Sequence, residues 1–282
     1  MNELSVLGEG ALEGVLEQLI EQQDILLPAF LAGLIILLSH IPLGQRVLNK
    51  GIIFFDLAIA QLSAFGVVLF SVLFSSLTHP LLVQLMAAGT AVGGALLLYR
   101  MRHLAVKLQE ALIGILFMLS ATGIMLLLAQ DPHAGEKFNT LLLGQILWIS
   151  YEDLDDLLLL TLGIGGLWWG LSRANRELAF YPCFALAITL STQWIGVYLV
   201  FASLILPALV SQNSRSPKTT AFVLGSSSYL LGLVISALLD LPSGAVISWT
   251  LALTALGFIV LKHSLTDKHQ IKSGQSPEPA AK

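Results

Sequence analysis

Long apolar runs, separated by short polar connections, dominate the sequence. Most of these runs approach the roughly 20 residues that a helix needs to cross the hydrocarbon core of a bilayer. They are rich in Leu, Ala and Gly and lack the apolar–polar alternation of a membrane-barrel strand. The pattern therefore predicts an all-α protein that crosses a membrane many times, with spans at Ile25–Leu38, Ile52–Leu77, Leu81–Tyr99, Ala111–Ala129, Leu154–Leu171, Ala221–Leu239 and Ala245–Leu261.

A further apolar stretch, residues 178–210, contains the helix breakers Pro182, Gly196 and Pro207. It is too long for one ordinary span and short for two. Breakers at membrane depth are tolerated where neighbouring protein or a cavity satisfies the freed backbone groups. We therefore expect two short or broken helices that meet near Gln193–Gly196. The chain then has about eight or nine transmembrane helices, or seven with a re-entrant pair.

Composition supports the membrane class. Only 11% of the 282 residues are charged and 56% are hydrophobic, whereas about 25% of a soluble domain is charged. The one cysteine, Cys183, excludes a disulfide framework and a thiolate-rich metal site, and in its apolar segment it is typical of a core residue. No basic stripe with interleaved aromatic residues indicates a nucleic-acid partner.

The positions of the basic residues predict the orientation, because Lys and Arg mark cytoplasmic loops. Of 14 basic residues, only Lys137 lies outside alternate connections. We therefore expect the N-terminus outside and the C-terminus in the cytoplasm. The predicted cytoplasmic residues are Arg46 and Lys50, Arg100, Arg102 and Lys107, Arg173 and Arg176, Arg215 and Lys218, and the tail from Lys262.

The sequence divides into three parts. Residues 1–24 form an acidic amphipathic segment on the outer side, predicted as a helix in the membrane interface or as a soluble extension of the first span. Residues 25–262 form the transmembrane domain. Residues 263–282, in which Gly, Ser, Pro and Lys replace the apolar run, are predicted to be a disordered cytoplasmic tail.

A carboxylate inside a span is costly and usually functional. Asp56 lies near the cytoplasmic start of the second predicted span, and Gln61 and Ser63 follow deeper in the membrane. These three residues are therefore candidates for a transport pathway. The alternative for Asp56 is a cap on its helix or an ion pair with Arg46 or Arg100.

Glu110 begins the fourth predicted span on the same side as Asp56, so the two carboxylates are expected to line one inner vestibule. Glu110 has an alternative role, since an acidic group near a helix N-terminus complements the helix dipole. His40 and His103 are predicted at cytoplasmic helix ends and His79 in an outer loop, so no histidine is expected at membrane depth.

Asp131, His133 and Glu136 are closely spaced in a predicted outer loop. Oxygen and imidazole ligands suit a divalent cation, so the loop is a candidate capture site, with an ordinary solvated loop as the alternative. The sequence has no Ser/His/Asp set, metalloprotease helix motif or phosphate-binding glycine loop. We therefore do not expect an enzyme.

Four stretches resemble the membrane permeases of zinc and manganese ABC importers, the metal ABC transporter permease family. The resemblance extends over roughly residues 25–262, and these four stretches carry it. The stretches are Pro42–Gly51 leading into Phe54–Gly66, Glu110–Phe117, Leu142–Leu154 and Ile195–Ala208. Gln61 stands where many members of the family carry His.

The resemblance implies an all-helical permease of a bacterial inner membrane, paired as a homodimer with the translocation path at the subunit interface. It implies a cytoplasmic ATPase subunit, which hydrolyses the ATP, and an extracytoplasmic metal-binding protein. The cargo would be a divalent metal ion, zinc foremost and manganese or iron as alternatives, moved by alternating access. No stably bound cofactor is implied. Arg173, Arg176, Glu177 and Leu178 match a shortened form of the segment that contacts the ATPase.

Two other functions remain open from the sequence. The chain could be a non-transporting regulatory or assembly subunit that binds partners through the shortened segment. It could also be an ABC permease for a different cargo, such as a chelate.

Overall fold

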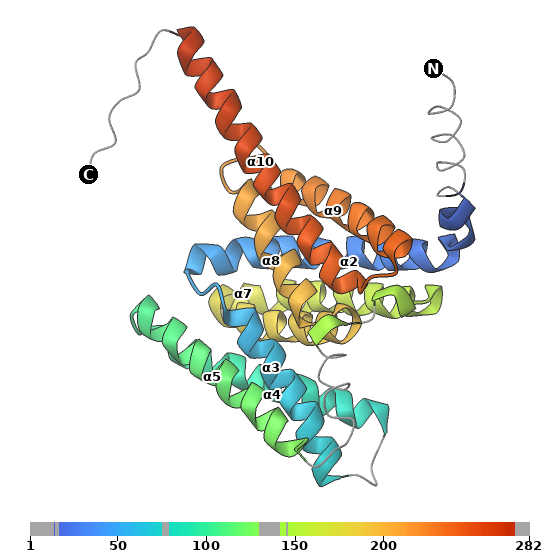
Figure 1. Ribbon diagram of the computed structural model, residues 1–282. Coiled ribbons are helices and arrows are strands. Elements are labelled where there is room, and N and C mark those ends of the chain that lie inside the picture. The colour runs from blue at the N-terminus through green and yellow to red at the C-terminus, as the bar shows by residue number, and fades with distance from the viewer. Residues whose placement is uncertain (1–13, 15–16, 75–78, 130–141, 145, 274–282) are drawn as a thin grey trace.

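The computed structural model describes residues 14, 17–74, 79–129, 142–144 and 146–273 (Figure 1). Within these ranges the chain is helical and contains no strand. Seven helices are long and apolar enough to cross a membrane, which confirms the predicted all-α fold. The elements are α2 (Gln23–Lys50), α3 (Phe55–Leu73), α4 (Pro80–Arg100), α5 (Val106–Leu127), the short η1 (Ile146–Trp148), α7 (Tyr151–Ile195), α8 (Val197–Ser211), α9 (Pro217–Leu239) and α10 (Ser243–Ser273).

The 45-residue element α7 is two helices joined at Asn175, whose backbone is extended (φ −155°, ψ 102°). The Trp168 and Phe180 rings lie 6.4 Å apart between centroids, on opposite sides of this residue. In one straight helix, twelve residues would separate their backbones by about 18 Å. The chain therefore folds back at Asn175, and α7 supplies two spans, as the apolar pattern predicted.

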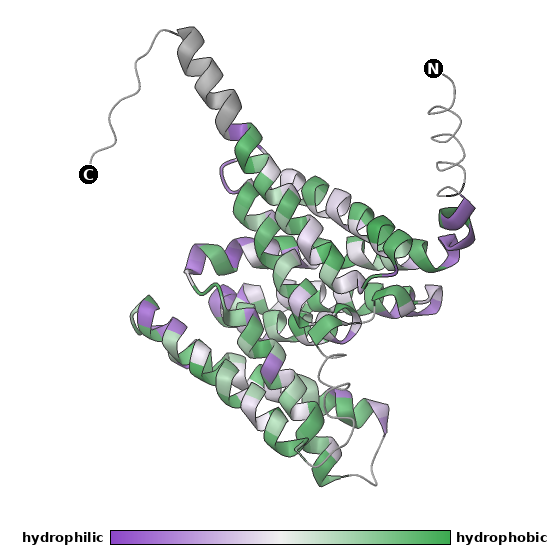
Figure 2. Ribbon diagram, in the orientation of Figure 1, coloured by the Kyte–Doolittle hydropathy of each residue, from purple (hydrophilic) through white to green (hydrophobic). Residues whose placement is uncertain are grey.

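Two groups of helices pack around the α7 hairpin (Figure 1). Helices α4 and α5 pack on α3, whereas α2, α8, α9 and α10 pack on one another. Helix α7 contacts α2, α3, α4 and α8, so it joins the groups. Hydrophilic residues concentrate at the helix ends and apolar residues fill the lengths between them (Figure 2).

The outer surface of the helices is strongly apolar. Leu126, Leu159 and Trp249 are 78%, 70% and 70% exposed, while Phe184 and Tyr229 are fully buried. A water-soluble protein rarely leaves so many large apolar side chains uncovered. Such a surface is typical of a protein whose helices lie in the hydrocarbon of a bilayer.

Helix α2 differs from its predicted span, because it does not stop at Leu38 but continues through Pro42 to Lys50. Arg46 and Lys50 therefore lie on the last turns of a helix and not in a loop. A proline inside a membrane helix is tolerated when neighbouring groups satisfy the freed carbonyl. The predicted break in 178–210 is confirmed, since Gly196 separates α7 from α8.

The ends of the chain are described in part. Residues 17–21 are helical, and the Gln18 side-chain amide donates a hydrogen bond to the Ala237 carbonyl at the end of α9. Helix α10 reaches Ser273, and so includes the beginning of the segment predicted as a tail. Most of residues 1–16 and all of 274–282 lie outside the described residues.

Candidate translocation and coupling sites

Three polar side chains are buried along α3. Asp56, Gln61 and Ser63 are 1%, 3% and 3% exposed. The beginning of this helix is fixed by Phe55, which stacks on Phe184 of α7 with 4.7 Å between ring centroids. Because Phe55 anchors the first turn in the core, the neighbouring carboxylate is carried inside the protein.

The Asp56 carboxylate has no hydrogen-bond partner on either oxygen within the described residues, and neither has the Gln61 carbonyl oxygen. The backbone N–H groups of Asp56 and Leu57, at the start of α3, interact with this carboxylate without meeting the geometry of a hydrogen bond. The alternative pairing with Arg46 or Arg100 is not found in the described part of the chain. Buried polar groups normally have partners, and an unpartnered one marks a functional position or a ligand.

His40 was predicted at a cytoplasmic helix end, but helix α2 continues past it. It is fully buried ten residues before the end of α2. Its Nδ1 lies 3.0 Å from the Ile36 carbonyl oxygen. The Ser39 hydroxyl lies 3.1 Å from the same nitrogen. A carbonyl only accepts, so the Ile36 contact favours the tautomer with the proton on Nδ1, in which Nε2 has a free lone pair. Nε2 has no partner among the described residues. The apolar run ends at Leu38, so no sequence pattern indicated that the helix continues past His40 to Lys50.

Glu110 lies in the second turn of α5 and is half-buried. The beginning of α5 lies against the turn before α3, where a β-carbon on Gly51 would meet Val106 at 3.3 Å. Asp56 and Glu110 therefore stand at the N-terminal ends of neighbouring helices. Both the vestibule role and the dipole role of Glu110 stay predictions.

Asn175 begins the second half of α7. Its side-chain oxygen accepts hydrogen bonds from the backbone N–H groups of Glu177 and Leu178, each at 3.0 Å. This is the geometry of an N-cap, and it satisfies two of the donors that the first turn of a helix leaves free. The predicted coupling segment is therefore not a loop but the vertex of a helical hairpin.

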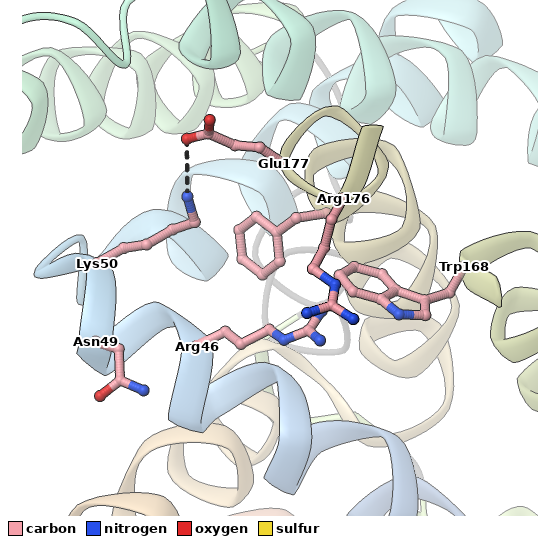
Figure 3. A pocket seen from close by; sticks show the side chains of 7 residues that line it. Arg46, Asn49, Lys50, Trp168, Arg176 and Glu177 are labelled. Atoms are coloured by element: carbon pink, nitrogen blue, oxygen red, sulfur yellow. Dashed lines mark hydrogen bonds and ion pairs between the residues drawn. The ribbon is translucent and has the colours of Figure 1, made fainter. Parts of the chain in front are cut away.

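The predicted coupling residues surround this vertex. Glu177 accepts from Lys50 of α2 at 3.3 Å (Figure 3). It also lies 3.6 Å from Arg102, which follows α4. Arg173 stacks on Trp169, with 3.5 Å from the guanidinium carbon to the ring centre. Leu178 is 38% exposed. Glu177 thus links its own connection to those of Lys50 and Arg102. All three connections were predicted to be cytoplasmic from their basic residues.

The other two family-like stretches meet elsewhere in the fold. Gly144 (φ +68°) and Gly196 (φ +78°) adopt conformations that glycine favours, and their backbones touch. A β-carbon on Gly144 would lie 2.1 Å from the Ile195 carbonyl carbon, and one on Gly244 would lie 2.3 Å from the Leu143 oxygen. We call Gly144, Gly196 and Gly244 the glycine junction.

Ser150 and Asp153 of the third stretch form a capping box at the start of α7. The Asp153 carboxylate accepts from the Ser150 N–H at 2.8 Å, and the Ser150 hydroxyl accepts from the Asp153 N–H at 3.4 Å. The motif has a structural role.

The predicted outer capture site, Asp131, His133 and Glu136, lies outside the described residues. Among the residues that the structure does describe, no group of three or more His, Cys, Asp or Glu side chains is placed to hold a metal ion.

Buried, unpartnered polar groups on the helices of a multi-span fold are typical of membrane transport proteins. The family comparison agrees: the profile of the ABC 3 transport family matches residues 22–167 and 168–262. The chain belongs to this family. The resemblance to metal ABC permeases is thereby confirmed.

Two solved structures share the fold. One is a chain of PsaBC from Streptococcus pneumoniae, in complex with Fab, with 20% identity, a TM-score of 0.64, and coverage of 88% of this chain and 95% of that one. The other is described as a metal-chelate type ABC transporter in an inward-facing conformation, with 18% identity, a TM-score of 0.61, and coverage of 85% and 87%. No curated protein matches the sequence significantly.

Proposed function

We propose that this chain is the membrane-spanning permease subunit of an ATP-driven importer of divalent metal ions, with zinc as the first candidate and manganese or iron as alternatives. The observation that carries the proposal is the buried Asp56 carboxylate, which has no partner in the described part of a family member that spans the membrane. A passing cation supplies the partner that the protein does not.

The side chains suit weak, transient binding. Asp56, Gln61 and Ser63 offer oxygen atoms along α3, and His40 offers one imidazole nitrogen from α2. Hard oxygen ligands and a single imidazole hold divalent ions without the permanence of a thiolate site. Transport requires binding that is favourable enough to admit the ion and weak enough to release it.

Movement would follow alternating access, in which the path opens first to one side and then to the other. ATP hydrolysis would be performed by a separate cytoplasmic ATPase subunit that contacts the α7 vertex at Arg173, Arg176, Glu177 and Leu178. Because Glu177 also bonds Lys50 and approaches Arg102, a push on the vertex would reach α2 and the end of α4.

The remaining partners follow from the same proposal. An extracytoplasmic binding protein would deliver the metal, and a second copy of the chain would complete the path. The chain would lie in a bacterial inner membrane with its N-terminus outside and its C-terminus in the cytoplasm, as the basic residues indicate.

Uptake into proteoliposomes tests the proposal. The purified chain, its ATPase and its binding protein would be reconstituted and supplied with zinc, manganese or iron, with and without ATP. ATP-dependent accumulation of one metal supports the importer. If the ATPase co-purifies and hydrolyses ATP but no free metal accumulates, the result contradicts a free metal ion as the cargo.

A metal chelate is the second candidate cargo, since one protein with this fold is described as a metal-chelate type ABC transporter. The same vesicles supplied with chelated metal separate the two cargoes. If no ATPase co-purifies under mild detergent conditions, the chain is a non-transporting regulatory or assembly subunit.

A further inference from the structure

A pocket with excess positive charge lies beside the α7 vertex, and we call it the cationic pocket. Its volume is about 440 Å³. Residues at the end of α2 and on both halves of α7 line it: Arg46, Asn49, Lys50, Trp168, Arg176, Glu177 and Phe180 (Figure 3). Three basic groups and one carboxylate leave two positive charges.

The unmatched charge belongs to two arginines. Glu177 is already engaged by Lys50 and Arg102. Arg46 and Arg176 form no ion pair within the described ranges, although the two guanidinium groups are close enough to repel each other. Figure 3 shows both side chains extending toward Trp168. The Arg46 guanidinium carbon lies 3.8 Å from the centre of that ring.

This arrangement suits a phosphate group. Guanidinium groups bind phosphate through paired, charge-assisted hydrogen bonds, and stacking on an aromatic ring holds the planar group in place without using its donors. A bound phosphate would also relieve the repulsion between the two arginines. The missing component of the cationic pocket is therefore an anion.

A second hollow, the apolar groove, begins where the cationic pocket ends. Its volume is about 290 Å³, and Arg46 and Trp168 line both hollows. The rest of its lining is mostly apolar and includes Ile35, Leu38 and Leu43 of α2 and Leu158, Leu162 and Gly165 of α7. From Arg46 to Ile35 it follows α2 for about 16 Å, close to the depth of one leaflet of the hydrocarbon core.

The groove opens to the bilayer. Its edge residues Leu38, Leu158 and Leu162 are 59%, 42% and 64% exposed. A segment of a cytoplasmic protein has no access to this depth without burying its backbone polar groups in lipid. An acyl chain has no such groups, so it is the occupant that the groove fits.

We propose that the cationic pocket and the apolar groove together bind one anionic phospholipid. Its phosphate contacts Arg46 and Arg176, and one acyl chain lies between α2 and the first half of α7. Basic pockets between membrane helices on the cytoplasmic side are typical binding sites for anionic headgroups. The lipid would brace α2 against the hairpin next to the vertex proposed to meet the ATPase. Arg176 would then face the lipid phosphate, so the ATPase contact would rest on Arg173, Glu177 and Leu178.

Native mass spectrometry of the detergent-purified chain tests the lipid site. The probes are phosphatidylglycerol, phosphatidylcholine and inorganic phosphate. The double variant Arg46→Gln/Arg176→Gln is compared with Arg100→Gln/Lys107→Gln, which removes the same charge outside both hollows. We expect wild type to prefer phosphatidylglycerol over phosphatidylcholine by about tenfold, the first variant to lose the preference and the control to keep it.

A second variant tests the groove independently of the arginines. Gly165 lines the groove, and a β-carbon there would meet nothing within 4 Å, so Gly165→Leu places its side chain in open space at the groove. It should weaken phosphatidylglycerol binding by about tenfold, whereas Gly163→Leu, outside the groove lining and equally unhindered, should not.

Four results would overturn the lipid site. These are equal binding of both lipids by wild type, unchanged binding in both variants (selectivity kept in Arg46→Gln/Arg176→Gln and full phosphatidylglycerol affinity kept in Gly165→Leu), binding of inorganic phosphate as tight as that of the lipid, and displacement of the lipid by the ATPase subunit. If Gly165→Leu separated a dimer and left lipid selectivity intact, the groove would be an interface between copies of the chain.

Discussion

Trp168 and Phe180 belong to one 45-residue helical element, yet their rings meet edge to face with 6.4 Å between centroids. The contact exists because the helix is interrupted at a single residue, Asn175, and folds back on itself. The same interruption places Glu177 within reach of α2 and of Arg102. One break thus creates both the sixth span and the proposed coupling vertex.

Replacing the Asn175 cap should destabilise the hairpin. Asn175→Ala removes the acceptor of two backbone hydrogen bonds, which costs about 0.5–2 kcal/mol for a typical N-cap. We expect thermal unfolding in detergent to occur at a lower temperature than in wild type. Asn175→Asp keeps the acceptor and should unfold as wild type does. Equal unfolding temperatures for the Ala and Asp variants would show that the cap contributes nothing.

The glycine junction should tolerate no side chain. Gly196→Ala forces a residue with a β-carbon to adopt φ +78° and places that carbon 2.3 Å from the Gly144 nitrogen. Strain of this kind and the clash together should cost at least about 2 kcal/mol. The expected result is a large loss of folded, monodisperse protein on size-exclusion chromatography. Gly163→Ala, with open space around the new carbon, should behave as wild type or better.

Glu177 should matter more for coupling than for stability. Its side chain is 51% exposed, and exposed ion pairs contribute about 0–1 kcal/mol. Glu177→Gln should therefore leave the unfolding temperature nearly unchanged while it lowers transport-coupled ATP hydrolysis in the reconstituted complex. If the variant lost stability but kept full coupling, Glu177 would have a structural role and not a coupling role.

Replacing His40 by an apolar residue should keep or raise stability but lower metal transport. His40→Leu replaces an unsatisfied buried nitrogen by an apolar group of similar size, so the unfolding temperature should stay the same or rise. Metal uptake should fall several-fold if the free Nε2 lone pair meets the ion. Unchanged uptake in a folded variant would mean that His40 is only a core residue.

The spans were predictable from the sequence, but their ends were not. Apolar runs of bilayer length identify helices because backbone groups have no other way to be satisfied in lipid. The break at Gly196 was also visible, since a glycine interrupts an apolar run. The end of α2 was predicted too early, because the apolar run stops at Leu38 whereas the helix continues through the polar residues and Pro42 to Lys50.

The candidate site was predictable only as a set of residue types. Asp56, Gln61 and Ser63 stood out because polar residues are rare inside spans. That Asp56 is unpartnered depends on where Arg46 and Arg100 point, and this is decided by packing. The contact of Gly144 with Gly196 joins positions about fifty residues apart, and no local pattern encodes it.

The most direct test of the account replaces the Asp56 carboxylate by an uncharged group of the same shape. Asp56→Asn and wild type would be reconstituted with the ATPase and the binding protein, and ATP-driven metal accumulation measured beside ATP hydrolysis. We expect the variant to fold and bind the ATPase but to lose at least about tenfold in metal accumulation, equivalent to about 1.4 kcal/mol of ion stabilisation. Accumulation at the wild-type rate would contradict a metal path along α3.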